Sequence, residues 1–236
     1  TAFIDLGAGR GSLSFWLTKL IENEKLEQSK VLVIDRASVR FKRDNKVDDR
    51  SIVERIKVDI GDLDMTKVDF GPCKSLVGVS KHLCGGATDL AIKCLLNANT
   101  EAIKAQGILI CVCCHHQITH NTFVGRDWLF ANGVTRRAFE VIIKLASWCT
   151  CGDGRSREER KEGLIEDHER RKEMEEIGWK CKRLMDYARV EYLRSNGYEA
   201  NLSYYVDKIH TIENICIVGE FMGAKVVEVA AVEASN

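Results

Sequence analysis

The sequence lacks an excess of charge, a long apolar run and an N-terminal signal peptide. Its 236 residues include 35 lysines and arginines against 35 aspartates and glutamates. Bulk charge therefore does not indicate a nucleic-acid partner, and only local charge can. The longest apolar run, 107–114, is too short to cross a bilayer and fits a buried strand. We expect no membrane partner.

A chain of this length can bury a sizeable core as one α/β domain, with or without an insertion. It begins on an apolar segment and not on a methionine, so we expect an excised domain with a further segment upstream. The expected catalytic domain is 1–225, in which 119–200 forms an insertion or substrate-binding region. Residues 226–236 are expected to form a tail that is disordered or added by cloning.

Ten cysteines are spread along the chain, which is too long for a small secreted domain held together by disulfides. We expect reduced thiols, in the cytoplasm, the nucleus or both. Cys111, Cys113 and Cys114 lie close together on one expected strand, where they cannot pair with each other without distortion.

The most informative pattern is the segment 5–11, DLGAGRG, which follows the apolar run 2–4 and precedes an expected helix. Glycines lack Cβ atoms, so backbone N–H groups can approach a ligand beside the positive end of the helix. The dinucleotide fingerprint needs a further glycine where this chain has Ser12. Asp5 suits instead a cationic ligand with an amino-acid tail, such as S-adenosylmethionine. The alternative is an ordinary tight connection between strand and helix.

Apolar runs at 31–35, 75–80 and 107–113 predict strands, because such runs are typical of a parallel sheet covered on both faces. A shorter alternating run at 55–60 predicts a further strand. Asp35 ends one of them near the place where nucleotide-binding units carry a ribose-binding carboxylate. The loop 81–86 follows the strand 75–80, and ligands of open α/β sheets bind at the carboxyl ends of strands. We therefore expect the chemistry at this loop.

The second half of the chain predicts two helices and a return to strands. A polar loop at 152–157 leads into a charged helix over about 157–177, which we interpret as a surface insertion. A second helix, about 180–195, has an apolar face, and its cations project from its other faces. Strands return over 201–221, most clearly at 215–218.

Two motifs are more specific than the glycine loop: 81–89, KHLCGGATD, and 113–117, CCHHQ. Together with 182–186, KRLMD, and Glu213-Asn214, they resemble the eukaryotic tRNA 2′-O-methyltransferase family that modifies the fourth nucleotide of the acceptor stem. The resemblance runs from the first strand to about Gly219. Where the family pattern has an acid and a glycine after the KRLMD segment, this chain has Tyr187 and Ala188.

This resemblance implies an α/β, Rossmann-like fold that binds S-adenosylmethionine, with a central, mostly parallel sheet and helices on both faces. It implies tRNA as the partner, and zinc-binding modules upstream that this chain does not contain. Together with the glycine-loop and strand patterns, it gives a cofactor site in which three residues surround the adenine. The expected cofactor residues are Asp5, Gly7, Ala8, Gly9, Gly11, Asp35, Arg36, Asp59, Ile60 and Asp62, of which Asp59, Ile60 and Asp62 flank the adenine.

A ribose hydroxyl is a poor nucleophile unless a base takes its proton or a cation stabilises the developing alkoxide. Lys81 and His82 supply these two kinds of group at the end of a strand, and His115 and His116 are the second candidates. The alternatives are cofactor positioning or loop packing for His82, and a structural role for His115 and His116.

Cysteine chemistry offers two competing uses for the 113–116 segment. Structural zinc ligands are usually two to four residues apart, because neighbours on an extended chain point in opposite directions. A composite site with Cys149 and Cys151 is an alternative, but we expect no metal. Enzymes that methylate pyrimidine carbons pair proline with a catalytic cysteine, and exocyclic amino methyltransferases use a proline-rich loop. The single proline, Pro72, fits neither, so hydroxyl chemistry is favoured.

Local positive charge supplies the expected RNA contacts. Four cations on the helix 180–195 are expected to contact phosphates: Lys182, Arg183, Arg189 and Arg194. The segment 36–57 adds eight basic residues against four acidic ones. Double-stranded RNA is recognised through its shape, its phosphates and its 2′-hydroxyls. The alternative is that these cations pair with nearby acidic residues.

We therefore expect a tRNA ribose 2′-O-methyltransferase that uses S-adenosylmethionine and acts on the acceptor stem. Two other functions stay open. One is a related methyltransferase that acts on protein or on another RNA, and the other is a cofactor-binding or RNA-binding module without activity.

Overall fold

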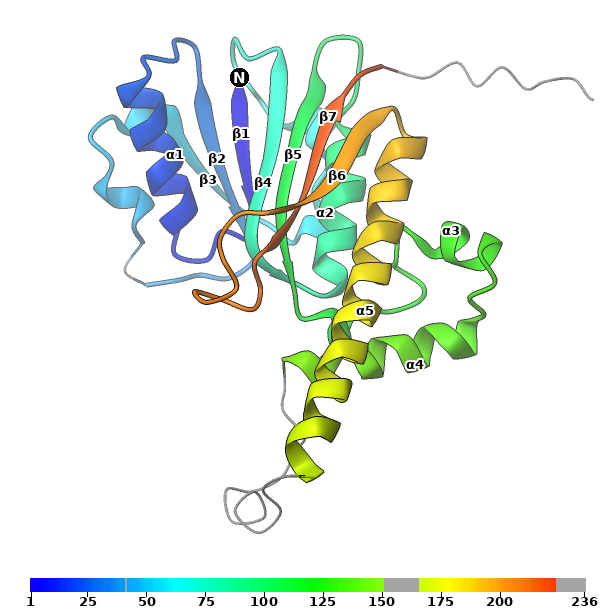
Figure 1. The fold of residues 1–236 in the computed structure, drawn as a ribbon. Coiled ribbons are helices and arrows are strands. Elements are labelled where there is room, and N and C mark those ends of the chain that lie inside the picture. The colour runs from blue at the N-terminus through cyan, green and yellow to red at the C-terminus, as the bar shows by residue number, and fades with distance from the viewer. Residues whose placement is uncertain (41, 151–165, 224–236) are drawn as a thin grey trace, which may run out of the picture.

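The computed structural model describes residues 1–40, 42–150 and 166–223. Its centre is a seven-stranded sheet in the order β3-β2-β1-β4-β5-β7-β6 (Figure 1). The strands are β1 (Ala2–Leu6), β2 (Lys30–Asp35), β3 (Val53–Lys57), β4 (Ser75–Cys84), β5 (Lys104–Cys113), β6 (Tyr198–Tyr204) and β7 (Ile215–Phe221). The first five run parallel, and β7 is antiparallel to both of its neighbours.

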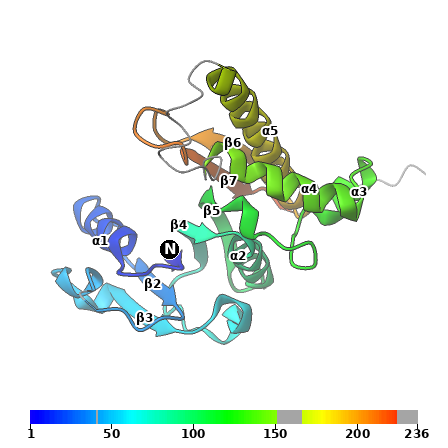
Figure 2. The ribbon, with the colours of Figure 1, turned by 90° about the horizontal axis from the view of Figure 1, so that it is seen from below.

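Helices cover both faces of the sheet, as Figure 2 shows. Helix α1 (Ser12–Asn23) lies on one face, where Ile21 packs against Val31 and Val33. Helix α2 (Gly86–Asn97) and the end of α5 (Glu166–Ser195) lie on the other face, where they share one apolar cluster with Leu32 and Ile34, and α5 packs against β6 and β7. Successive residues of β2 thus point to opposite faces, and both faces are apolar. The expected Rossmann-like α/β fold is confirmed.

Strand β4 is longer than expected. The loop predicted at 81–86 is strand as far as Cys84, with an irregularity in its pairing to β5 between Lys81 and Leu83. His82 lies in this irregularity with a φ of 69°, in the left-handed region that side chains seldom adopt. The physical reason is that β5, which ends at Cys113 as expected, pairs with β4 as far as Cys84.

The two helices expected over 157–177 and 180–195 are one helix, α5. Its glycine, Gly178, is buried and helical and does not end the helix. A Cβ atom at this position would lie 2.7 Å from the backbone nitrogen of Cys149, so glycine allows close packing here instead of a break. The predicted loop 152–157, the helix residues before 166 and the tail 226–236 lie outside the described residues.

Helices α3 (Arg126–Ala131) and α4 (Arg136–Ala146) lie beside α5 and away from the sheet (Figure 1). They share a second apolar cluster with α5, in which Phe123, Phe139 and Met185 are buried. The division of the chain at 119–200 stays a prediction. None of the helices in the described parts of the chain combines the length and apolar character needed to cross a membrane.

Candidate functional site

A cavity of about 570 Å³ opens at the carboxyl ends of β1, β2 and β4. The sequence analysis predicted six of the residues that line it: Gly7, Asp35, Arg36, Asp59, Ile60 and His82. It missed nine others: Ala37, Leu83, Cys84, Gly86, Ala87, Leu90, Gln117, Thr119 and Thr122. Four of these nine residues belong to the KHLCGGATD motif, and the motif was the sequence signal that could have identified them: Leu83, Cys84, Gly86 and Ala87.

The glycine loop is held to the sheet by its own amides. The N–H groups of Gly7 and Ala8 both donate to the Ile34 carbonyl, at 2.9 and 3.0 Å, and the Gly9 N–H donates to an Asp35 carboxylate oxygen at 2.7 Å. These donors are therefore already paired, and the expectation that they approach a ligand is wrong. Gly7 still borders the cavity, where a Cβ atom would lie 2.6 Å from the Leu83 side chain.

Gly11 is required by its backbone conformation and by the close approach of Asp44, and not by contact with the cavity. Its φ is 74°, and a Cβ atom would lie 2.5 Å from a carboxylate oxygen of Asp44. Asp44 makes two hydrogen bonds to Arg55, each 2.9 Å, and Arg55 donates a third to the Gly9 carbonyl at 3.1 Å. Gly11 therefore accommodates this ion pair and does not border the cavity. Ala8 and Gly9 are also absent from the cavity wall.

Asp35 and Asp59 place two carboxylates at the cavity. The oxygens of Asp35 accept backbone hydrogen bonds from Gly9 and Ala37, each 2.7 Å long. Asp59 accepts from the Gly61 N–H at 3.0 Å, and this bond holds the pKa of Asp59 below its ordinary value. The Arg36 guanidinium lies 3.4 Å from Asp59 on the exposed rim. The cavity thus presents charged acceptors beside the apolar side chains of Ile60, Leu83 and Leu90.

Asp5 and Asp62 do not reach the cavity, contrary to expectation. Asp5 is 1% exposed and accepts two hydrogen bonds from Ser14, at 3.0 Å from the amide and 2.5 Å from the hydroxyl. It therefore stabilises the start of α1. Burial raises the pKa of Asp5 to about 6, although the Ser14 bonds act in the opposite direction. Asp62 is exposed and outside the cavity wall.

Lys81 and His82 are adjacent but face different surroundings. His82 lines the cavity. The Lys81 ammonium lies 5.3 Å from the centre of the Tyr205 ring and outside that wall. Only His82 of the four predicted catalytic residues borders the cavity.

His115 is buried behind the cavity, and His116 is exposed outside its wall. Nε2 of His115 lies 2.6 Å from an Asp186 carboxylate oxygen, and Nδ1 has no hydrogen-bond partner. Burial lowers the pKa of His115, although Asp186 acts in the opposite direction. The structure thus gives His115 the surroundings of a structural histidine away from the cavity wall, and its catalytic role stays a prediction.

Two of the four cations expected to contact RNA are buried. Arg189 is 0% exposed and binds Asp89 at 2.7 Å, Asp186 at 3.5 Å and the Gly85 carbonyl at 3.2 Å. Lys182 is 1% exposed and lies 2.5 Å from Glu213. These side chains cannot reach phosphates from the helix surface, because their charges are already paired inside the fold.

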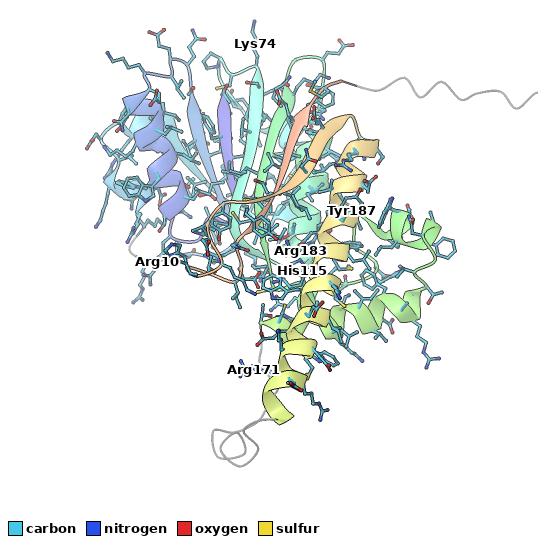
Figure 3. The ribbon with its side chains drawn as sticks, in the orientation of Figure 1. Arg10, Lys74, His115, Arg171, Arg183 and Tyr187 are labelled. Atoms are coloured by element: carbon cyan, nitrogen blue, oxygen red, sulfur yellow. The ribbon has the colours of Figure 1, made fainter. Side chains whose placement is uncertain are left out.

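Arg183 and Arg194 are partly exposed. Arg183 lies 3.1 Å from Asp186, at the junction of α5 with the end of the sheet where Figure 3 also places His115. Arg194 donates to Glu191, to the Ala200 carbonyl and to Asn201. Their contact with RNA stays a prediction.

A second cavity, of about 700 Å³, lies between α5 and the loop that joins β6 and β7. Aromatic and cationic side chains surround it. Tyr204 is 72% exposed, and the ammonium groups of Lys182 and Lys208 lie 4.9 and 5.3 Å from the centre of the Trp179 ring. Its lining consists of Trp179, Tyr204, Tyr205, Val206, Asp207, Lys208 and Asn214. The sequence analysis did not find this cavity.

Comparison with known proteins gives a family match over most of the chain. The family model described as Methyltransferase TRM13 matches residues 1–220. The tRNA:m(4)X modification enzyme TRM13 of Yarrowia lipolytica is 32% identical, over 91% of this chain and 53% of that protein. The human homologue of the same name is 27% identical, over 91% of this chain and 59% of that protein. The chain therefore spans little more than half the length of these relatives.

Among solved structures, a 16S rRNA (adenine(1408)-N(1))-methyltransferase variant from Catenulisporales acidiphilia, with cosubstrate SAM, superposes with a TM-score of 0.42 at 10% identity. The superposition covers 95% of this chain and 86% of that one.

Proposed function

The chain belongs to the TRM13 methyltransferase family, and we propose on this basis that it transfers a methyl group from S-adenosylmethionine to a ribose 2′-hydroxyl in the acceptor stem of tRNA. One observation supports this function most directly. The cavity at the carboxyl ends of the parallel strands combines charged acceptors, an apolar wall and an imidazole, at the place where open α/β sheets bind their ligands.

The residues of the cavity fit S-adenosylmethionine. Its volume of about 570 Å³ is within the range usual for small-molecule sites. Asp35 offers acceptors to ribose hydroxyls, and Ile60 and Leu90 offer an apolar surface to an adenine. When bound, the cofactor supplies an electrophilic methyl group on a sulfonium.

His82 is the side chain best placed to assist the acceptor hydroxyl. It is exposed on the cavity wall, and imidazole is the group that proteins most often use to take a proton in a transition state. Lys81 lies on the side of Tyr205, where its charge can stabilise a nearby anion. The proposed division of roles is therefore proton transfer at His82 and charge stabilisation at Lys81.

The second cavity supports an RNA substrate. Aromatic rings stack with nucleobases, and cations beside them attract phosphates. Trp179, Tyr204 and Lys208 supply both kinds of group, and Lys81 lies against Tyr205 of the same cavity. We propose that this cavity holds a part of the tRNA next to the reacting nucleotide.

The experiment uses unmodified tRNA and S-adenosylmethionine with a labelled methyl group. Nuclease and alkaline digestion then locate the label, and a 2′-O-methyl group gives an alkali-resistant dinucleotide. His82→Ala is expected to lower the single-turnover rate by about 100-fold or more, the usual contribution of a proton-transfer residue, while cofactor affinity stays within about 3-fold. His116→Ala, an exposed histidine outside the cavity, is the matched control.

Three outcomes would contradict these assignments. A labelled methyl group on a base or on protein would show that ribose is not the acceptor. A full single-turnover rate in His82→Ala would exclude His82 as the proton acceptor. Unchanged tRNA binding in Trp179→Ala and Lys208→Ala would remove the second cavity from the RNA site.

The alternative is a module that binds the cofactor or tRNA without transferring a methyl group. Such a module would bind S-adenosylmethionine and tRNA and yet transfer no methyl group in the labelling experiment.

A further inference from the structure

Three cysteine thiols meet where β4 and β5 end. The Sγ atoms of Cys84, Cys113 and Cys114 all lie within 4.8 Å of one another. Cys84 and Cys113 are opposite each other in the parallel pairing of the two strands, and their sulfur atoms are 3.7 Å apart. Among the described residues, no other set of three cysteine, histidine or acidic side chains is close enough to share a metal ion.

The backbone at Cys114 explains how two consecutive cysteines face the same point. Neighbouring residues on an extended strand point in opposite directions, which is the objection to a metal site in this segment. Cys114, however, leaves the strand with φ 50° and ψ 44°, in the left-handed region. This conformation is unfavourable for a residue with a side chain, and it turns the Cys114 thiol back toward Cys113 and Cys84.

The spacing of the sulfur atoms fits a tetrahedral ion. Zinc binds thiolate at about 2.3 Å, so two sulfur atoms on one tetrahedral zinc lie about 3.8 Å apart. Cys84 and Cys113 already have this separation, at 3.7 Å. Cys113 is buried, whereas Cys84 is exposed, so an ion can enter from the side of Cys84. Small side-chain movements would bring Cys114 to the same distance.

We propose that Cys84, Cys113 and Cys114 bind one zinc ion. Each thiol releases its proton as it binds, and water reaches the fourth position from the exposed side. His115 is not part of this set, because it does not belong to the group of ligand atoms that lie within 4.8 Å of one another. The site therefore differs from the composite one considered from the sequence, and it revises the expectation of no metal.

The proposed ion connects the two strands that shape the reactive cavity. Cys84 lines that cavity, and its sulfur lies 3.5 Å from the carbonyl oxygen of His82. Binding of zinc fixes the end of β4 against β5, and thereby the irregular segment that carries His82. A ligand that binds only the folded chain also stabilises it in proportion to its occupancy.

The test uses the whole chain, reduced and freed of metal with a chelator. Native mass spectrometry measures the zinc bound, and titration with Co²⁺ reports thiolate ligands through their charge-transfer absorption. We expect one ion per chain and a raised thermal midpoint with zinc. Cys84→Ser and Cys114→Ser are expected to lower the affinity by more than about 100-fold, beyond the loss typical of an outer hydrogen-bond partner. Both variants spare the buried Cys113.

Cys111 and Cys216 provide the matched control. Their sulfur atoms lie 3.5 Å apart on paired strands, but no third ligand from the described part of the chain lies close enough to share an ion with them. Cys111→Ser and Cys216→Ser are expected to retain the ion.

Failure of the parent chain to bind one equivalent of zinc would overturn the proposal. Zinc affinities in Cys84→Ser and Cys114→Ser that equal the affinity of the parent chain would also overturn it. So would a Cys84–Cys113 disulfide that forms with oxidised glutathione in a chain that binds no zinc, since this would show a redox pair. None of these measurements depends on methyl transfer.

Discussion

Asp5 and Asp35 both lie near the carboxyl ends of parallel strands beside the glycine loop, yet they have different surroundings. Asp35 lines the cavity and holds the amides of Gly9 and Ala37. Asp5 is buried and holds Ser14 at the start of α1. One carboxylate is therefore available to a ligand, whereas the other contributes to the stability of the loop.

Asp35→Ala is expected to weaken S-adenosylmethionine binding by about 10-fold or more, because a hydrogen bond to a charged group is worth about 1.5 to 3 kcal/mol. Titration calorimetry measures the affinity, and circular dichroism checks that the variant folds. Asp62→Ala, an exposed carboxylate outside the cavity wall, is the control and is expected to bind normally. Normal affinity in Asp35→Ala would remove this residue from the cofactor site.

Asp5 makes stability depend on pH in the direction opposite to that of most carboxylates. Its pKa in the folded chain is about 6, above the ordinary 3.8. Between these values the folded state holds a proton that the unfolded chain has released, so the contribution of Asp5 to stability falls as pH rises from about 4 to about 6.

Asp5→Asn keeps an acceptor oxygen for Ser14 but cannot ionise. Relative to the parent chain, its free energy of unfolding is expected to increase by up to about 3 kcal/mol between pH 4 and pH 7. Urea denaturation at several pH values measures this difference. A difference that does not change with pH would show that Asp5 has an ordinary pKa in the folded chain.

Helix α5 continues through Gly178 because of what packs against it. Glycine inside a helix usually costs about 0.5 to 1 kcal/mol relative to alanine. At this position, however, a Cβ atom would lie 2.7 Å from the backbone nitrogen of Cys149 and 3.1 Å from the Leu145 carbonyl. Backbone atoms are not displaced as easily as the end of a flexible side chain, so the close packing requires glycine.

Gly178→Ala is therefore expected to destabilise the fold by about 1 to 3 kcal/mol, as overpacking typically does, although helix propensity alone predicts a gain. Urea denaturation measures the change. Glu173→Ala, at an exposed position of the same helix, is expected to change stability by less than about 0.5 kcal/mol. A stabilised Gly178→Ala variant would mean that α5 lies further from Cys149.

At the scale of the whole molecule, a buried ionic network joins α5 to the sheet. Arg189 of α5 binds Asp89 of α2 and the Gly85 carbonyl beside the cavity, and Asp186 of the same helix binds His115 after β5. Burial acts to raise the pKa of Asp186, but His115, Arg183 and Arg189 together hold it below its ordinary value. This network fixes the helix relative to the cavity.

Arg189→Met is expected to destabilise the chain by about 3 to 5 kcal/mol, because removing one partner leaves buried carboxylates without compensation. Adding Asp89→Asn removes one of these charges, so the double variant is expected to recover part of the loss. Chemical denaturation of the parent, both single variants and the double variant gives the coupling energy. Additive single effects would show that Arg189 and Asp89 do not act as a pair.

The sequence prediction agrees with the cavity wall at several residues near strand ends, and their contact with a cofactor or substrate stays a prediction. Asp35, Asp59 and His82 lie at or just after strand ends, and all three line the cavity. The prediction that Lys182 and Arg189 contact RNA did not anticipate their burial, since helical periodicity identifies the face of a residue but not what packs against that face. The sequence prediction also missed Gln117 and Thr119, which reach the cavity from the segment after β5.

The sequence by itself determined the strands of the parallel sheet, the glycine loop between the first strand and helix and the motifs of the family, because these depend on local features such as apolar runs and missing Cβ atoms. Only the tertiary structure decided which cations are buried and which sulfur atoms meet. Cys84 and Cys113 are 29 residues apart along the chain, and the pairing of β4 with β5 brings them into contact. Such pairing depends on how the whole core packs, which no short stretch of sequence specifies.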